Sequence, residues 1–212
     1  MNLKGKSEKE IRTAIRGLKN EIGRLKNIAE HPEYQCMIHP SESVQIWCTR
    51  LYLEEAKKAL SEIGGEYKPS QAELKAQEFE DNIPNIAEIE FCIGGYFGGY
   101  PTYRVDLTGD EIKVLYTPAF ADEANSEDYF IGEDEELYTK DYFLDLFKDL
   151  HIGEWRNRYT LDRFGYAILD GTQWYLIIKY KDGKRSRRFY GDNSYPYNFD
   201  RLCDLFGIEN DE

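Results

Sequence analysis

Apolar residues recur every three or four positions over residues 7–31, which is the spacing of one face of an α-helix. Ser7 and Glu10 have the spacing of an N-terminal capping box. The segment ends at His31-Pro32, because the residue before a proline disfavours helical backbone. The stripe consists of Ile11, Ile15, Leu18, Ile22, Leu25 and Ile28. We therefore expect an amphipathic helix with one buried side.

A second amphipathic segment begins near Ser41 or Ser43 and stops at Gly64-Gly65, a typical helix C-terminus. Its apolar residues are Val44, Trp47, Cys48, Leu51, Tyr52, Ala56, Ala59, Leu60 and Ile63. Two helices of similar length joined by a short loop are expected to pack antiparallel. Residues 1–65 are thus predicted to form a helical hairpin. Because the second stripe is wide, it is also open to a contact with the rest of the chain or with a second copy.

A third helix is indicated by Ser70 and Glu73, which again have the spacing of a capping box. This helix is polar and stops before Pro84, so residues 66–86 are predicted to be a helical connector.

From Ala87 onward the apolar period changes to two, the signature of half-buried strands. Asp182-Gly183 is a preferred hairpin turn between two of these strands. The predicted strands cover 89–93, 103–107, 112–116, 166–169, 174–180 and 185–190, and short helices cover 139–150 and 198–206. The expected fold class is α+β: an N-terminal antiparallel helical hairpin followed by an antiparallel-sheet domain with short helices over residues 87–212.

Charge is distributed unevenly along the chain, whose formal net charge is −13. Residues 1–64 hold 11 lysines and arginines against 9 aspartates and glutamates, whereas the remainder holds 16 against 31. The densest acidic stretch, residues 121–139, has no lysine or arginine. Its carboxylates are Asp122, Glu123, Glu127, Asp128, Glu133, Asp134, Glu135 and Glu136. Such a run is typical of a solvated loop or of a docking surface for a basic partner.

Candidate chemical motifs are weak. His31, Cys36, His39 and Cys48 carry zinc-type donors, but they lack the spacing of a zinc finger. The glycines of the segment 94–101 form GGxxGG, which matches neither phosphate-loop pattern, so we expect a turn around which Tyr96, Phe97 and Tyr100 pack. No cysteine stands in a local motif with a histidine. The sequence therefore predicts no catalytic residue, no metal ligand and no cofactor.

One basic ribbon interrupts the acidic region between residues 179 and 188. It contains Lys179, Lys181, Lys184, Arg185, Arg187 and Arg188, next to Tyr180, Phe189 and Tyr190. Basic residues interleaved with aromatic ones can bind single-stranded nucleic acid. The surrounding negative charge makes direct nucleic-acid binding the less favoured interpretation, and charge protection of an edge strand is the simpler one.

The cellular location is predicted from two signals that the sequence lacks, a signal peptide and a membrane span. The N-terminal residues contain no apolar signal-peptide core, and no apolar run reaches the length of a membrane span. The four cysteines are scattered, as free thiols of a reducing compartment are. We expect a cytoplasmic protein without a membrane partner.

Two stretches carry a family resemblance: WYLIIKYKDGKRSRRFYGDNSYPYNFDRL, residues 174–202, and HPSESVQIWCTRLYLEEAKKAL, residues 39–60. They resemble segments of uncharacterised acidic proteins of Firmicutes and their mobile elements, of the anti-CRISPR or antitoxin inhibitor type. The resemblance implies an inhibitor that works by binding another protein, and it assigns no site residues.

Together these observations predict a non-enzymatic inhibitor or adaptor. Its eight carboxylates between Asp122 and Glu136 would dock on the basic face of a nucleic-acid-binding protein, such as a CRISPR effector or another nuclease. The hairpin would brace the domain, mediate self-association as a homo-oligomer, or add a second contact. Two alternatives remain open: an enzyme whose site is assembled only by the fold, around His151 or a cysteine, and a direct nucleic-acid binder through the hairpin or the basic ribbon.

Overall fold

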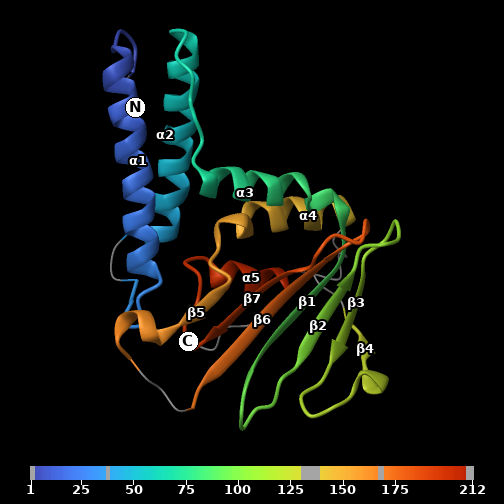
Figure 1. Cartoon of the computed structure of the whole chain (residues 1–212). Helices are drawn as coiled ribbons and strands as arrows, with labels where there is room; N and C mark the ends of the chain where they lie inside the picture. Colours follow the sequence, from blue (N-terminus) through green and yellow to red (C-terminus); the bar gives the residue numbers. More distant parts are fainter. Residues whose placement is uncertain (1–2, 37–38, 130–138, 167–169, 209–212) are drawn as a thin grey trace. The chain divides into compact units, whose positions relative to one another are not determined.

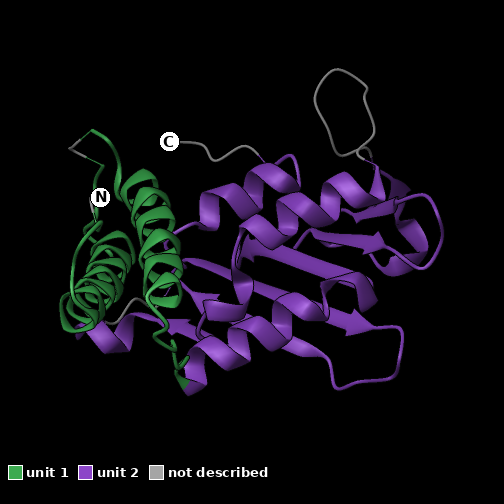
Figure 2. Cartoon of the chain, turned by 90° about the horizontal axis from the view of Figure 1, so that it is seen from above, with its two compact units in different colours: residues 1–70 green, residues 71–212 purple. Residues whose placement is uncertain are grey.

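The chain forms two compact units, residues 1–70 and residues 71–212, which have separate colours in Figure 2. We describe them from a computed structural model that covers residues 3–36, 39–129, 139–166 and 170–208. The predicted α+β fold class is confirmed: two closely packed N-terminal helices precede a mostly antiparallel sheet with short helices (Figure 1). The helix that the sequence assigned to a connector lies within the second unit.

The first unit is a hairpin of α1 (Glu8–Ala29) and α2 (Glu42–Glu62). The predicted capping box at the start of α1 is present. The Ser7 hydroxyl accepts a hydrogen bond from the Glu10 backbone N–H, and the Glu10 carboxylate accepts one from the Ser7 N–H at 2.9 Å. The buried side of α1 consists of Ile11, Ile15, Ile22 and Leu25, all members of the predicted stripe. The other two members differ, since Leu18 is partly buried and Ile28 is exposed.

The buried face of α2 shares only Ala56 and Leu60 with the predicted stripe. It consists of Glu42, Ile46, Thr49, Leu53, Ala56 and Leu60. Of the predicted apolar residues, Val44, Trp47, Leu51, Tyr52 and Ile63 are exposed, with 57% of Trp47 accessible. This helix therefore carries two apolar stripes. One is buried and the other is exposed.

The second unit is a seven-stranded sheet with strand order β4-β3-β2-β1-β6-β7-β5 and short helices. Its helices are α3 (Gln71–Asp81), η1 (Ile83–Asn85), η2 (Glu123–Asn125), α4 (Lys140–Asp149), η3 (Ile152–Glu154), η4 (Leu161–Phe164) and α5 (Phe199–Leu205). Its strands are β1 (Ile86–Gly95), β2 (Thr102–Asp106), β3 (Lys113–Thr117), β4 (Glu127–Asp128), β5 (Arg158–Thr160), β6 (Thr172–Tyr180) and β7 (Arg187–Asp192). Neighbouring strands are antiparallel except β5 and β7, which are parallel.

The two faces of the sheet have opposite chemistry. Alternate strand residues such as Phe91, Leu176 and Phe189 are fully buried against aromatic side chains of the helices. Figure 1 shows α3, α4 and α5 on this face of the sheet. The intervening residues, among them Glu88 and Lys179, lie on the other face and form an ion pair across β1 and β6 at 2.6 Å. Each buried aromatic side chain contributes about 1.5–3 kcal/mol to folding, so the helix-covered face holds the sheet together.

Two elements differ from the sequence prediction. The acidic stretch predicted to be a solvated loop contains η2 and the two-residue strand β4, which pairs with β3. A three-residue strand, β5, runs parallel to β7, where the sequence indicated only an antiparallel meander. Both strands are too short to produce an alternation of apolar and polar residues, so no periodic signal marks them.

Candidate functional site

The predicted docking carboxylates lie at the β4 edge of the sheet, as far as the structure describes them. Asp122 precedes η2, Glu123 is its first residue, and Glu127 and Asp128 form β4. All four are exposed. The other four predicted residues, Glu133, Asp134, Glu135 and Glu136, lie outside the described residues. The structure therefore brings half of the predicted set together at one edge of the sheet.

Glu123 is held by a cation of β2, Arg104. Its carboxylate accepts a hydrogen bond from the Arg104 guanidinium at 2.7 Å, and this contact lowers the pKa of Glu123. The same guanidinium lies 3.4 Å from Glu90 and 3.6 Å from Glu88. Three carboxylates thus share two cations on the uncovered face of the sheet, Arg104 and Lys179, the latter 2.6 Å from Glu88 and 4.0 Å from Glu90. Their excess negative charge is available to a positively charged partner.

Exposed aromatic side chains occur in the β1–β2 turn and in the segment that leads into η2. Phe97, in the β1–β2 turn, is 84% exposed, and its ring meets that of Tyr96 edge to face at a centroid distance of 5.2 Å. Phe120, in the segment between β3 and η2, is 81% exposed. Soluble proteins rarely leave several large aromatic side chains exposed in one place without a function.

Phe120 is held outward by an unfavourable backbone conformation. Its φ is 63°, in the left-handed region that costs a bulky residue about 1–2 kcal/mol. Its ring lies against Gly99, where a Cβ atom would stand 2.9 Å from Phe120 Cε2 and 2.8 Å from Ala119 Cβ. Only glycine leaves room for the ring at this position. Strained residues of this kind cluster at binding sites, because the fold must hold them in place.

We call Tyr96, Phe97, Phe120, Asp122, Glu123, Glu127 and Asp128 the acidic–aromatic surface. The sequence identified its carboxylates but not its aromatic residues, which it expected to pack around the glycine turn. The structure leaves Tyr96 and Phe97 largely exposed instead. The signal that was available is the composition of the turn, because GGYFGGY places two large rings between glycines that provide no side chains to cover them.

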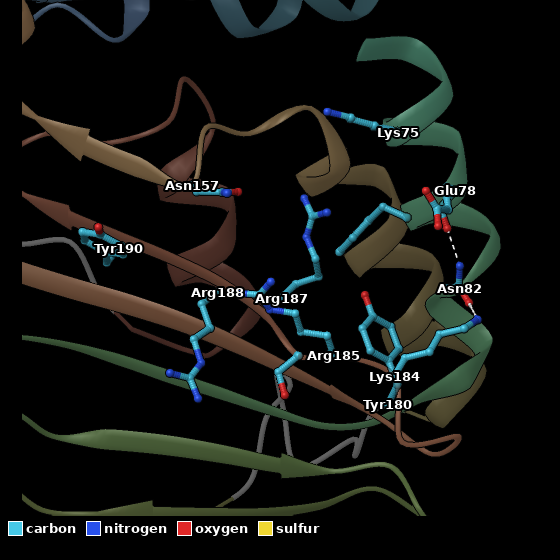
Figure 3. A pocket seen from close by; sticks show the side chains of 12 residues that line it. Lys75, Glu78, Asn82, Asn157, Tyr180, Lys184, Arg185, Arg187, Arg188 and Tyr190 are labelled. Carbon is cyan, nitrogen blue, oxygen red and sulfur yellow. Dashed lines mark hydrogen bonds between the residues drawn. The ribbon is translucent and has the colours of Figure 1, made fainter. Parts of the chain in front are cut away.

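The basic ribbon lies at the other edge of the sheet, beside a cleft of about 1000 Å³ (Figure 3). One wall is α3, with Lys75, Glu78 and Phe79, and the other wall is β7 and the turn before it. Arg185, Arg187 and Arg188 line the cleft from the β7 side, and Asn157 closes one end. We call this region the basic cleft. It lies on the far side of the sheet order from the acidic–aromatic surface.

The other candidates for chemistry are the histidines and cysteines. In the described part of the chain, no three histidine, cysteine or acidic side chains gather closely enough to hold a metal ion. His151 pairs with Glu80 through Nδ1 at 3.1 Å, which ties α3 to the residue preceding η3. Burial raises the pKa of the thiols of Cys92 and Cys203, which favours their inert protonated form.

No helix in the described ranges combines the length and the apolar character that crossing a bilayer requires. Comparisons of the chain with protein-family models, with curated proteins and with solved structures find no match. Its function must therefore be argued from its own surfaces.

Proposed function

We propose that the protein is a non-enzymatic inhibitor that docks its acidic–aromatic surface on the basic face of a nucleic-acid-binding protein. The observation that carries this proposal is the position of Phe120, a strained and largely exposed aromatic residue two positions before Asp122 and three before Glu123. Aromatic anchors surrounded by charge are the composition of a protein-binding hot spot.

The aromatic residues would supply the affinity. A Phe or Tyr side chain buries a large apolar area on binding and loses little conformational entropy, because it has only two rotatable bonds. The side chains of Phe97 and Phe120 are both largely exposed, so a partner would bury most of each ring. Anchors of this size commonly contribute 2 kcal/mol or more each, about a 30-fold change in affinity.

The carboxylates would supply the selectivity for a basic partner. Residues after 64 hold 31 acidic and 16 basic residues, so the second unit carries a strongly negative field. Such a field accelerates encounter with a basic surface and repels nucleic acid. A partner whose nucleic-acid-binding face is covered in this way loses access to its substrate. CRISPR effectors and toxin nucleases are partners with this chemistry.

The test begins with affinity capture by the full chain, followed by purification of the captured protein. The proposal requires that this protein binds nucleic acid, that DNA or RNA competes with the interaction, and that raised salt weakens it. Reversing the described carboxylates in the variant D122K/E123K/E127K/D128K should abolish binding. Unchanged affinity in this variant contradicts the proposal.

A matched control separates position from net charge. The variant E111K/D145K/D149K/D204K changes charge by the same amount at exposed sites away from the acidic–aromatic surface. It should retain most of the affinity, because short-range contacts at the surface are preserved. Equal losses in the two variants would show that only the overall field matters and that no docking surface exists.

A further inference from the structure

The basic cleft holds positive charge that the protein does not neutralise. Lys75, Arg185, Arg187 and Arg188 all line it, and none of them lies within 4.0 Å of a carboxylate in the described residues. Lys184, by contrast, is paired with Asp182 at 3.1 Å and donates to Asn82 at 2.6 Å. Arg188 alternates with Arg187 along β7, so its side chain points to the other face of the sheet. Three unpaired cations in one concavity are still unusual in a chain of net charge −13, and they call for an anionic ligand.

Packed aromatic side chains of α3 and β7 lie beneath the cleft. Arg187 lies with its guanidinium 5.8 Å from the ring centroid of Phe79 and 5.6 Å from that of Phe189. Phe79 and Phe189 in turn meet edge to face at 6.5 Å, which joins α3 to β7. Figure 3 shows α3 and β7 on opposite sides of the cleft with Arg187 between them. Arg187 is therefore positioned by packed aromatic residues of two elements, α3 and β7.

The β7 side of the cleft is also an unpaired strand edge. β6 pairs with all of β7, from Arg187 to Asp192, whereas β5 pairs only with residues 190–192. The Tyr190 N–H donates to Asn157 O at 3.2 Å, on the β5 side. Backbone groups of alternate strand residues point the same way, so the N–H and C=O of Arg188 point to the side that β5 leaves vacant. Among the described residues, no strand pairs with 187–189 on that side.

We propose that the basic cleft binds an extended acidic peptide, which adds to the edge of β7 as a further strand in line with β5. The peptide backbone would pair with the N–H and C=O of Arg188, and its carboxylates would neutralise Lys75, Arg185 and Arg187. Addition of a peptide strand to an exposed sheet edge is a common recognition mode, in which the main chain gives affinity and side chains give specificity. This inference is independent of the proposed inhibitor function, since it concerns the opposite edge of the sheet and a ligand of opposite charge.

The strand edge favours a peptide over nucleic acid. Arg188 presents a donor and an acceptor together, and a peptide backbone offers the complementary pair. A phosphate has only acceptor oxygens and would leave the Arg188 carbonyl unpaired. The free edge spans three residues, about 10 Å at 3.3 Å per residue, which fits a short peptide.

The first test is the fluorescence anisotropy of the full chain with three labelled probes. The probes are a ten-residue peptide of alternating glutamate and valine, the same peptide N-methylated at alternate backbone amides, and a ten-residue deoxythymidine oligonucleotide. N-methylation removes donors of one strand edge and keeps every charge, so it should weaken binding about tenfold or more. Equal affinity of the two peptides, or preferential binding of the oligonucleotide, would overturn the proposal.

The second test compares two charge-matched variants. K75E/R185E should lose about tenfold or more of the peptide affinity, because both side chains line the cleft and are exposed. K113E/K148E changes charge equally at exposed positions outside the cleft and should lose much less. Circular dichroism shows whether each variant is folded. Equal losses in two folded variants would show that the cleft has no specific role.

The third test measures amide hydrogen exchange in the unmodified protein, so it does not depend on whether a variant folds. On saturation with the alternating peptide, the Arg188 amide should become protected, whereas amides at the acidic–aromatic surface should not. Binding without protection of Arg188 contradicts strand addition. These results leave the proposed inhibitor function untouched, because that function is tested with variants of the acidic–aromatic surface.

Discussion

The two edges of the sheet differ in both charge and construction. At the β4 edge, exposed carboxylates and aromatic rings lie on a short strand and on the segments around it. At the β7 edge, unpaired cations line a cleft between a strand and α3. One hydrophobic core supports both edges. The comparison teaches that a net charge of −13 describes neither edge, because the sheet separates negative and positive charge across its width.

The two edges also expose different kinds of binding group. The β4 edge relies on a strained residue, Phe120, whose ring is kept exposed beside Gly99. The β7 edge relies on an unused row of backbone groups and on cations packed against Phe79 and Phe189. Substitutions that remove strain at one edge and packing at the other should therefore have opposite effects on stability.

The largest effect is expected at the β7 edge from Phe189→Ala. This side chain is fully buried and meets Phe79 and Trp155. Its removal leaves a cavity and should lower the free energy of unfolding by about 3–5 kcal/mol, measured by urea denaturation. Tyr190→Ala, at the next position on the exposed face, should cost about 1 kcal/mol or less. Similar losses in the two variants would contradict the assignment of the buried face.

In the β1–β2 turn, where Gly99 lies against Phe120, Gly99→Ala should lower stability by about 1–3 kcal/mol. The new Cβ would stand 2.8 Å from Ala119 Cβ, and the φ of 73° is unfavourable for alanine. Gly98→Ala is the control, because a Cβ there meets nothing within 4 Å and its φ is not positive. Thermal unfolding of both variants checks the prediction, which fails if the two shift the melting temperature equally.

Phe120→Gly should raise stability by about 1 kcal/mol while it weakens partner binding. Glycine adopts a φ of 63° without strain, and the exposed ring contributes little burial to the folded state. Urea denaturation measures the first effect and titration with the captured partner measures the second. A loss of stability would mean that the ring is a structural contact and not a binding anchor.

The smallest effect concerns protonation of Glu123. The Arg104 contact lowers the pKa of Glu123, so its stabilising contribution is present above the ordinary glutamate pKa and is lost as pH falls through the lowered value. Arg104→Met should raise the pKa of Glu123, which carboxyl NMR measures directly. An unchanged pKa would show that the contact at 2.7 Å is not maintained in solution.

The sequence predicted the elements that have strong local signals. The capping box at Ser7 and the helix after Thr139 both appear, because each depends on residues a few positions apart. The hairpin around Asp182-Gly183 is also present, but β6 ends at Tyr180 and β7 begins at Arg187, so its connection is longer than the predicted two-residue turn. The side of α2 that is buried could not be predicted, since Trp47 and Ile46 are neighbours on adjacent faces and only contact with α1 decides between them.

The candidate sites were predicted only where their residues are close together in the sequence. Asp122, Glu123, Glu127 and Asp128 form one dense run, so their proximity followed from the sequence. The nearness of Phe120 to Gly99 depends on two segments that only the sheet brings together. The cleft joins Lys75 of α3 to Arg187 of β7, more than a hundred residues apart, and no local pattern indicates such a pair.

The most direct test of the inhibitor function is calorimetric titration of the purified partner with the wild-type chain and with F97S/F120S. This variant keeps every charge, and both side chains are more than four-fifths exposed in the wild type, so the fold should be retained. The account predicts a loss of affinity of about 100-fold or more, since two aromatic anchors are removed. Equal affinity of the two chains would contradict the account, because charge alone would then explain all binding.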